Sequence, residues 1–167
     1  VFPSIEVREA YSSRIVIKRL SERGIYKVNP LEALKLLHAD GYTHILIQSS
    51  TVIDGVEMES LYKNVEEVSR LFKDVRIGMP LLYSPQDYED VIKVLTAENK
   101  KDVAYIWVGH GTYDATTAQY AMLDYMLKAK GYTNCFVGTV EGYPEFDDVL
   151  AQLKASGLKE VVLMPFM

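Results

Sequence analysis

The sequence has one cysteine, no long apolar run and no phosphate-loop motif, and each shortage excludes a class of protein or site. The one cysteine among 167 residues, Cys135, excludes an intrachain disulfide framework and any zinc or iron–sulfur site built from several cysteines of this chain. No apolar run approaches the ~20 residues that a membrane-spanning helix requires. Neither GxxxxGKS/T nor a GxGxxG after a strand is present, so the sequence offers no phosphate loop and no dinucleotide fingerprint.

Positive charge is also scarce. The net charge is −5, from 18 basic and 23 acidic residues. This balance argues against a general nucleic-acid or membrane-binding surface, although it is compatible with a local basic pocket. Hydrophobic residues make up 49% and charged residues 25%, which is typical of a folded protein and argues against disorder. The length indicates one domain, or two small halves that share a core.

The two ends do not resemble natural chain ends. The sequence starts Val1-Phe2-Pro3, without an initiator Met or a signal peptide. It ends in an apolar run, 161–167, that resembles a core strand. We therefore expect an internal fragment of a longer protein, inactive alone and with apolar sheet surface left exposed.

The hydrophobic pattern alternates between strand and helix periods. Helix caps are expected at Ser12 or Ser13, at Asn29 before Pro30, and at Ser84, where Asp87 completes a capping box. Glycines are expected to end four helices, at Gly24, Gly41, Gly131 and Gly157. The first expected helix carries Ile15, Val16 and Leu20. The helical faces expected to be buried in the others are Leu31, Leu34 and Leu37; Met58, Leu61, Val65, Val68 and Phe72; Tyr88, Val91, Ile92 and Leu95; Ala118, Met122, Met126 and Ala129; and Phe146, Val149, Leu150 and Leu153. Short β-branched or apolar runs predict strands at 5–9, 43–48, 75–79, 103–108, 135–140 and from 160 onward.

This alternation predicts an α/β fold of two similar halves, with mostly parallel sheets flanked by helices. A weak internal repeat supports it. Residues 30–47 and 144–163 both contain a proline, a helix, a glycine and a strand starting four residues after the glycine. We expect a boundary near 98–102, giving an N-terminal half at 1–100 and a C-terminal half at 101–167. Two βα units could also converge on this pattern.

Ligands of parallel sheets bind beyond the carboxyl ends of the strands, so functional residues are expected in three loops, 48–57, 109–114 and 141–145. His110 is the strongest candidate, because it follows an apolar strand and stands between two glycines that leave its imidazole accessible. A turn histidine packed on a helix is the competing interpretation. Glu141 could share a divalent ion with a histidine, or be a solvated loop acid. Glu57 begins a helix, where an acid is favoured by the helix dipole alone.

The other reactive residue types have structural interpretations. We expect His38 on a helix surface, His44 packed or solvated at a strand start, and Cys135 as a small buried apolar residue without an activating partner. Most of the 12 tyrosines are expected in the core or at its rim, although a few could line a flat aromatic ligand.

Several motifs, taken in order, resemble the anaerobic sirohydrochlorin cobaltochelatases of the CbiK type, class II chelatases of cobalamin biosynthesis. VGHG followed by VE-x-YPE is the most specific pair. The matching stretches are 9–12, 14–20, 31–34, 48–57, 78–82, 108–111, 137–145 and 163–165, which together span nearly the whole chain.

The resemblance implies two α/β halves that face each other across a cleft, in agreement with the repeat. It implies that His110 binds the metal and helps to remove pyrrole protons, that Glu141 completes the metal site, and that Glu57 handles metal ions or protons. The substrates would be Co²⁺ and the tetrapyrrole sirohydrochlorin, with no organic cofactor.

Three departures from the family pattern matter. Thr51 stands where the family usually has a histidine. The family's second metal-binding histidine lies beyond the strand that ends at 163–165, after the last residue of this chain. The family's first strand and its helix precede Val1.

The resemblance therefore predicts a lyase-type metal chelatase that inserts Co²⁺ into sirohydrochlorin. The alternatives are a chelatase for Fe²⁺ or Ni²⁺, a tetrapyrrole- or metal-binding protein without insertion activity, and an unrelated α/β domain that binds a small ligand. We expect a cytoplasmic protein without nucleic-acid or membrane partners. The physiological metal, the groups that bind the tetrapyrrole carboxylates and the oligomeric state, including a homo-oligomer, stay open.

Overall fold

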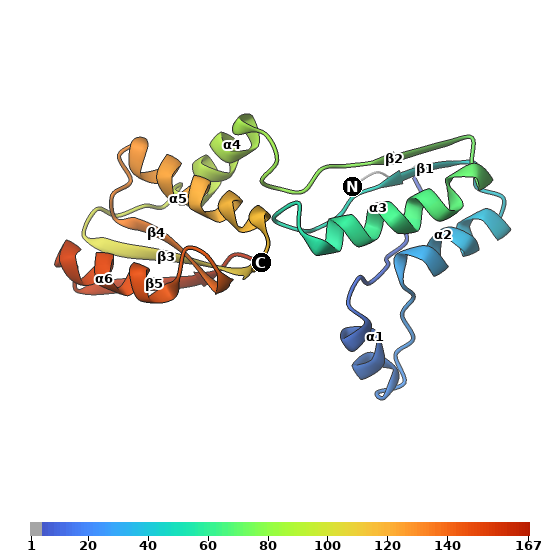
Figure 1. Cartoon of the computed structure of the whole chain (residues 1–167), viewed down its shortest axis with the longest axis horizontal. Coiled ribbons are helices and arrows are strands. Elements are labelled where there is room, and N and C mark those ends of the chain that lie inside the picture. Colours follow the sequence, from blue (N-terminus) through green and yellow to red (C-terminus); the bar gives the residue numbers. More distant parts are fainter. Residues whose placement is uncertain (1–4) are drawn as a thin grey trace. The chain divides into compact units, whose positions relative to one another are not determined.

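The computed structural model describes residues 5–167, which form helices and parallel strands in alternation (Figure 1). The α-helices are α1 (Arg14–Ser21), α2 (Pro30–Ala39), α3 (Val56–Val68), α4 (Pro85–Leu95), α5 (Ala118–Ala129) and α6 (Phe146–Ser156). The strands are β1 (His44–Ile47), β2 (Asp74–Ile77), β3 (Val103–Thr112), β4 (Cys135–Gly142) and β5 (Glu160–Pro165). Two single turns of 3₁₀-helix are η1 (Ser69–Leu71) and η2 (Ala115–Thr117). The predicted α/β class is confirmed.

The described chain divides into two compact units. The first contains the chain up to Ser49 together with Val56–Gly78, and the second contains Ser50–Gly55 together with Met79–Met167. The sequence predicts the division near 98–102 instead. The difference arises because α4 packs with the elements that follow it: Tyr88, Val91 and Ile92 share a core with Trp107 and α5.

In the first unit, α2 and α3 pack together against a two-stranded parallel sheet. β1 pairs with β2 in a register that runs from His44 opposite Asp74 to Ile47 opposite Ile77. The predicted faces of both helices meet in a core of Leu34, Ile45, Met58, Leu61, Val65 and Val68, against which Leu31 and Leu37 are partly buried. The predicted α3 pattern extends one turn too far, since the helix ends at Val68 and Phe72 follows η1.

Local signals define the ends of α2 as predicted. Asn29 and Glu32 form a reciprocal capping box, and Pro30 occupies the first turn. Gly41, with φ +87°, follows the helix in the left-handed backbone conformation that residues other than glycine rarely adopt.

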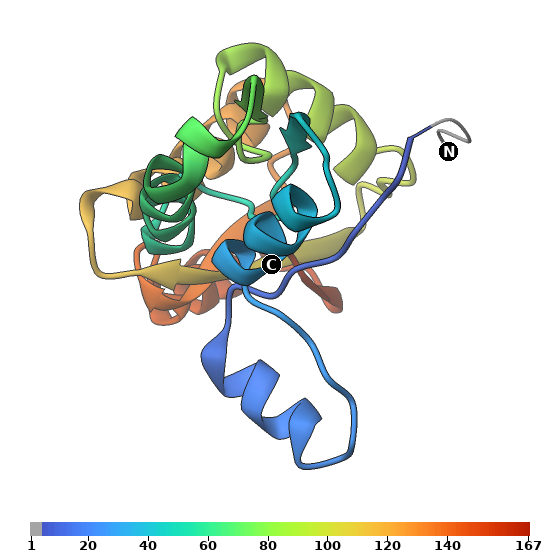
Figure 2. The same ribbon diagram turned by 90° about the vertical axis from the view of Figure 1, so that its right-hand side faces the viewer.

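The segment before α2 differs from the prediction. Ser13 caps α1 as expected, by accepting from the Val16 backbone N–H, but residues 5–9 form no strand. α1 buries no residue, and both views show it standing apart from α2 and α3 (Figure 1, Figure 2).

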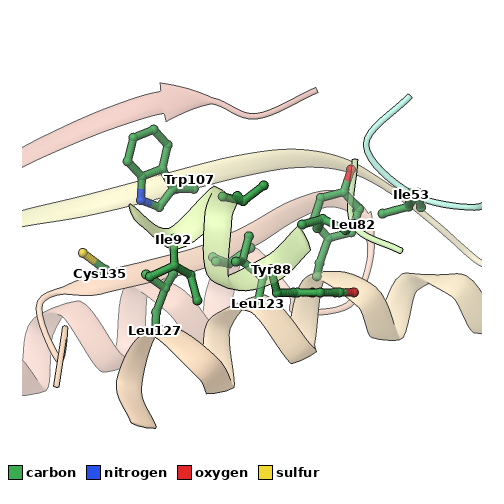
Figure 3. Packing of buried hydrophobic residues seen from close by; sticks show 11 residues of the cluster. Ile53, Leu82, Tyr88, Ile92, Trp107, Leu123, Leu127 and Cys135 are labelled. Carbon is green, nitrogen blue, oxygen red and sulfur yellow. The ribbon is translucent and has the colours of Figure 1, made fainter. Parts of the chain in front are cut away.

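The second unit is built on a three-stranded parallel sheet in the order β4-β3-β5. Alternate residues of β3 enter two cores on opposite faces of this sheet. Trp107 joins α4 and α5 in the larger core (Figure 3). Ala104 and Ile106 join Phe136 and Val149 of α6 in the smaller one.

Three predictions for this unit need correction. β3 and β4 extend through Thr112 and Gly142, further than the predicted ends at 108 and 140. α5 buries Tyr120, Leu123 and Leu127, and of the expected Ala118, Met122, Met126 and Ala129 only Met126 is partly buried against this core. β5 is a mostly exposed edge strand rather than a core strand, since it pairs with β3 alone among the described strands.

Apolar side chains are exposed on both sheets, as predicted. They are Leu46 of β1 and Val161, Leu163 and Met164 of β5. Within residues 5–167, none of the helices is long and apolar enough to cross a membrane.

Candidate metal site at the carboxyl edge of β3 and β4

His110 is exposed near the carboxyl end of β3, between two buried glycines. Each glycine has a packing reason. A Cβ added to Gly109 would lie 2.2 Å from Cε1 of the Tyr120 ring. A Cβ added to Gly111, which has φ +79°, would lie 1.7 Å from the carbonyl oxygen of Glu141. The glycines let α5 and β4 approach β3 closely. The backbone on both sides of His110 is therefore tightly packed, while His110 itself is exposed.

Glu141 lies on the neighbouring strand, opposite Gly111 rather than opposite His110. Residues in consecutive register positions of a pleated sheet point to opposite faces. His110 follows Ile106 and Val108 in this alternation, and the positive φ angles of Gly111 and Gly142 interrupt the pleat beside both candidate residues. His110 and Glu141 thus occupy adjoining positions at the carboxyl edge of the sheet, and the alternation that leads up to each residue assigns their side chains to opposite faces. The structure groups no three His, Cys, Asp or Glu side chains of residues 5–167 around a metal position.

The turn after β4 is fixed by two threonines. The Thr117 hydroxyl donates to the Tyr143 carbonyl oxygen at 2.7 Å and accepts from the Tyr143 backbone N–H at 2.9 Å. On the other side, the hydroxyl and backbone N–H of Thr139 both donate to the Pro144 carbonyl oxygen. The Tyr143–Pro144 peptide bond is cis. Glu141 is therefore carried at the start of a tightly tethered turn.

Asp114 organises the loop after β3. Its carboxylate accepts from the Thr116 backbone N–H at 2.8 Å, from the Thr116 hydroxyl, and from the Thr112 hydroxyl at 3.0 Å. These hydrogen bonds, led by the one from the Thr116 hydroxyl, lower the pKa of Asp114. The loop is thus capped by a carboxylate that is ionised at neutral pH.

Glu57 belongs to the first unit, where it is exposed in the first turn of α3. The loop just before it packs within the second unit. Ile53 enters the large core, and the Asp54 backbone N–H donates to Gln119 Oε1 at 2.9 Å. The carbonyl oxygen of Thr51, in the same loop, accepts from the Leu81 backbone N–H at 3.0 Å.

The remaining candidates lie where the sequence predicts. His38 is exposed on α2 and meets the Phe72 ring edge-on, with centroids 5.8 Å apart. His44 is exposed and shares a hydrogen bond with the Thr43 hydroxyl. Cys135 is buried, and burial raises the pKa of its thiol to about 11, so it is an unreactive core residue.

Sequence reasoning missed the residues that support this edge. Thr117, Thr139 and Asp114 carry no motif, and their roles depend on contacts made by the folded chain. Only the spacing Asp114-x-Thr116 offered a local signal, that of a side chain capping the backbone two residues on.

Many α/β proteins bind their ligands at the carboxyl edge of a parallel sheet. The exposed histidine and the carboxylate at this edge place the second unit in that class of protein. Comparison with known families narrows this class. The family model described as "Cobalt chelatase (CbiK)" matches residues 1–167, and the chain belongs to this family.

Two curated relatives extend the comparison. A protein of Salmonella typhimurium named sirohydrochlorin cobaltochelatase is 35% identical over 169 residues, which cover 99% of this chain and 64% of the relative. A protein of Nitratidesulfovibrio vulgaris named sirohydrochlorin cobaltochelatase CbiKC is 31% identical over 172 residues, which cover 99% of this chain and 61% of the relative. The chain thus spans less than two thirds of the length of either relative.

Proposed function

We propose that the intact protein is a sirohydrochlorin cobaltochelatase, which inserts Co²⁺ into sirohydrochlorin during anaerobic cobalamin biosynthesis. The observation that carries the proposal is the exposed imidazole of His110, held between two packed glycines next to the position of Glu141. Membership of the cobalt chelatase family and the names of the two relatives support the choice of metal and tetrapyrrole.

Insertion requires that the metal ion lose water ligands and that the ring lose two pyrrole protons. An unprotonated imidazole can do both kinds of work in sequence, first as a ligand of the ion and then as the acceptor of a proton. We assign these roles to His110. Glu141 would supply an exchangeable oxygen ligand, and Glu57 would relay protons or metal ions. Co²⁺ is a substrate in this scheme and leaves within the product.

The test is the rate of cobalt insertion by the intact protein with His110→Ala. We expect the rate to fall by about 100-fold or more, the scale of a positioned acid–base group. His38→Ala is the matched control, because His38 is also exposed but lies on α2. Near-normal insertion by the His110 variant would overturn the site, and binding of metal and ring without insertion by the wild type would overturn the activity.

Parallel assays with Co²⁺, Fe²⁺ and Ni²⁺ test the metal. We expect the highest kcat/KM with Co²⁺, and a clear preference for another ion would correct that part of the proposal. The cytoplasmic location stays a prediction, and the oligomeric state stays open.

A further inference from the structure

α1 forms the tip of an arm, which we define as residues 5–28. One extended leg leads into the helix and a second leads from it to α2, and the helix projects away from the body of its unit (Figure 1, Figure 2). None of the residues of α1 is buried. The helix therefore adds nothing to the cores of residues 5–167, and its side chains are exposed in this part of the protein.

The arm is anchored rather than loose. The Tyr11 backbone N–H donates to the Val28 carbonyl oxygen at 2.9 Å, which joins the two legs. Lys27 pairs with Glu9 at 2.9 Å and lies over the Tyr11 ring. At the base, Arg8 pairs with Asp40 at 2.6 Å. The contacts at the base of the arm give α1 a defined direction.

The tip carries a concentration of positive charge in an acidic chain. Residues 14–23 contain four basic residues, Arg14, Lys18, Arg19 and Arg23, against one acid, Glu22, which gives +3 where the whole chain has −5. All four are exposed, and none forms an ion pair with another residue in the described part of the chain. Elsewhere in the described chain, several lysines have a carboxylate within 3.1 Å, among them Lys27, Lys35, Lys63, Lys93 and Lys130. Others, including Lys100, Lys101 and Lys159, also lack an ion pair there, so what distinguishes the tip is four such charges within ten residues.

The positive side chains share a face with an apolar one. Arg14 and Lys18 are one helical turn apart, as are Ile15 and Arg19, so Ile15 lies among the three charges. Ile15 is 66% exposed. Like charges at this spacing destabilise an isolated helix, and an exposed isoleucine contributes nothing to the core. The face is therefore suited to a ligand that offers both anionic groups and apolar surface.

We propose that the α1 arm binds the carboxylates at the rim of the tetrapyrrole substrate, with Ile15 against the ring system. This inference rests on the proposed function. Sirohydrochlorin is an apolar macrocycle that carries many carboxylates, and charge complementarity selects it as the occupant of this face. Arg14 and Arg19 suit carboxylates particularly, because a guanidinium can donate two parallel hydrogen bonds to one carboxylate. Lys18 supplies a third positive charge between them.

The test compares two charge-matched triple variants of the intact protein. Arg14→Gln, Lys18→Gln and Arg19→Gln remove three charges from the arm. Lys100→Gln, Lys101→Gln and Lys159→Gln remove three exposed charges from the second unit. We expect the arm variant to bind metal-free sirohydrochlorin about tenfold more weakly, at a few-fold per exposed charge pair, and the control to bind like the wild type. In cobalt insertion, KM should rise while kcat changes little.

Several readouts can overturn the proposal. Equal binding by the arm variant and the wild type would do so, as would equal weakening of both triple variants. A second probe is sirohydrochlorin methyl ester, which lacks the carboxylates and should bind the arm variant and the wild type alike. A persistent difference with the ester would exclude carboxylate recognition. Arm-dependent binding to anionic phospholipid vesicles, without an effect on sirohydrochlorin, would point instead to a membrane surface.

Two controls keep these outcomes separate. Because α1 buries no residue, the arm variant should keep the circular dichroism and the unfolding midpoint of the wild type. The exchange Arg14→Lys, Lys18→Arg and Arg19→Lys keeps the charge and should restore most of the binding. Failure of the wild type itself to bind sirohydrochlorin would defeat the proposed function. Normal wild-type activity, together with an arm variant that binds sirohydrochlorin as tightly as the wild type, would defeat only this inference.

Discussion

At the scale of single residues, the glycines around His110 set the geometry of the candidate site. Gly111 combines a positive φ with a close approach to the Glu141 carbonyl oxygen. Gly142 repeats this on the other strand, where an added Cβ would lie 1.9 Å from the Thr112 carbonyl oxygen. The backbones of the two strands therefore approach each other closely at the point where His110 and Glu141 emerge.

Replacing Gly111 should disrupt this edge. Gly111→Ala adds left-handed backbone strain and a clash with β4, so we expect a loss of about 3 kcal/mol or more in the free energy of unfolding. Gly157→Ala is the matched control, because Gly157 has φ +71° but nothing within 4 Å of its added Cβ. This control should cost roughly 1 kcal/mol, the strain alone. Denaturant melts of both variants measure the difference, and similar losses would show that the close approach is unimportant.

The sequence predicts part of the site at this scale. The positions of His110 and Glu141 after apolar strands identify both as candidates, and the flanking glycines correctly predict an accessible imidazole. The register between β3 and β4, in contrast, could not be predicted from the sequence. Whether Glu141 lies opposite His110 or opposite Gly111 depends on pairing between residues about thirty positions apart, and no local signal encodes it.

At the scale of elements, identical capping residues have different structural importance. The Ser84 hydroxyl caps α4 at 3.4 Å from the Asp87 backbone N, and the Ser13 hydroxyl caps α1 at 3.3 Å from the Val16 backbone N. α4 buries Tyr88, Val91 and Ile92, whereas α1 buries nothing.

We expect Ser84→Ala to lower the free energy of unfolding by about 1 kcal/mol, the usual cost of a lost cap, because α4 is part of the core of the second unit. Ser13→Ala should leave global unfolding unchanged and increase only the local fraying of α1. Thermal melts give the global effect, and amide exchange in 14–21 gives the local one. A global loss with Ser13→Ala equal to that of Ser84→Ala would contradict the independence of the arm.

The same contrast explains which elements could be predicted from the sequence. Caps at Ser13, Asn29 and Ser84 and the glycines at Gly41 and Gly157 depend on contacts within a few residues, and the structure confirms them. The buried face of α5 depends on distant partners instead. Tyr120 turns inward because Gly109 leaves room for its ring, which the helical pattern of α5 alone does not reveal.

At the scale of the whole molecule, the described chain has separate cores in its two units. Leu34 and Met58 belong to the core of the first unit, and Leu123 and Trp107 to the larger core of the second. The predicted boundary at 98–102 relied on a polar stretch in the sequence. The compact units divide before α4 because the apolar face of that helix packs on α5, which is a property of tertiary contacts and not of local composition.

Separate cores predict separate responses to cavities. Leu123 and Met58 are fully buried, so Leu123→Ala and Met58→Ala should each cost about 2–5 kcal/mol in the stability of their own unit. Distant sites without shared partners respond independently. Native-state hydrogen exchange should therefore show that Leu123→Ala lowers the protection of β3 and β4 while α3 keeps its own, and that Met58→Ala produces the reverse pattern. If either variant lowered protection equally in both units, the two units would unfold as one cooperative body, because a cavity confined to one core could not otherwise expose the amides of the other.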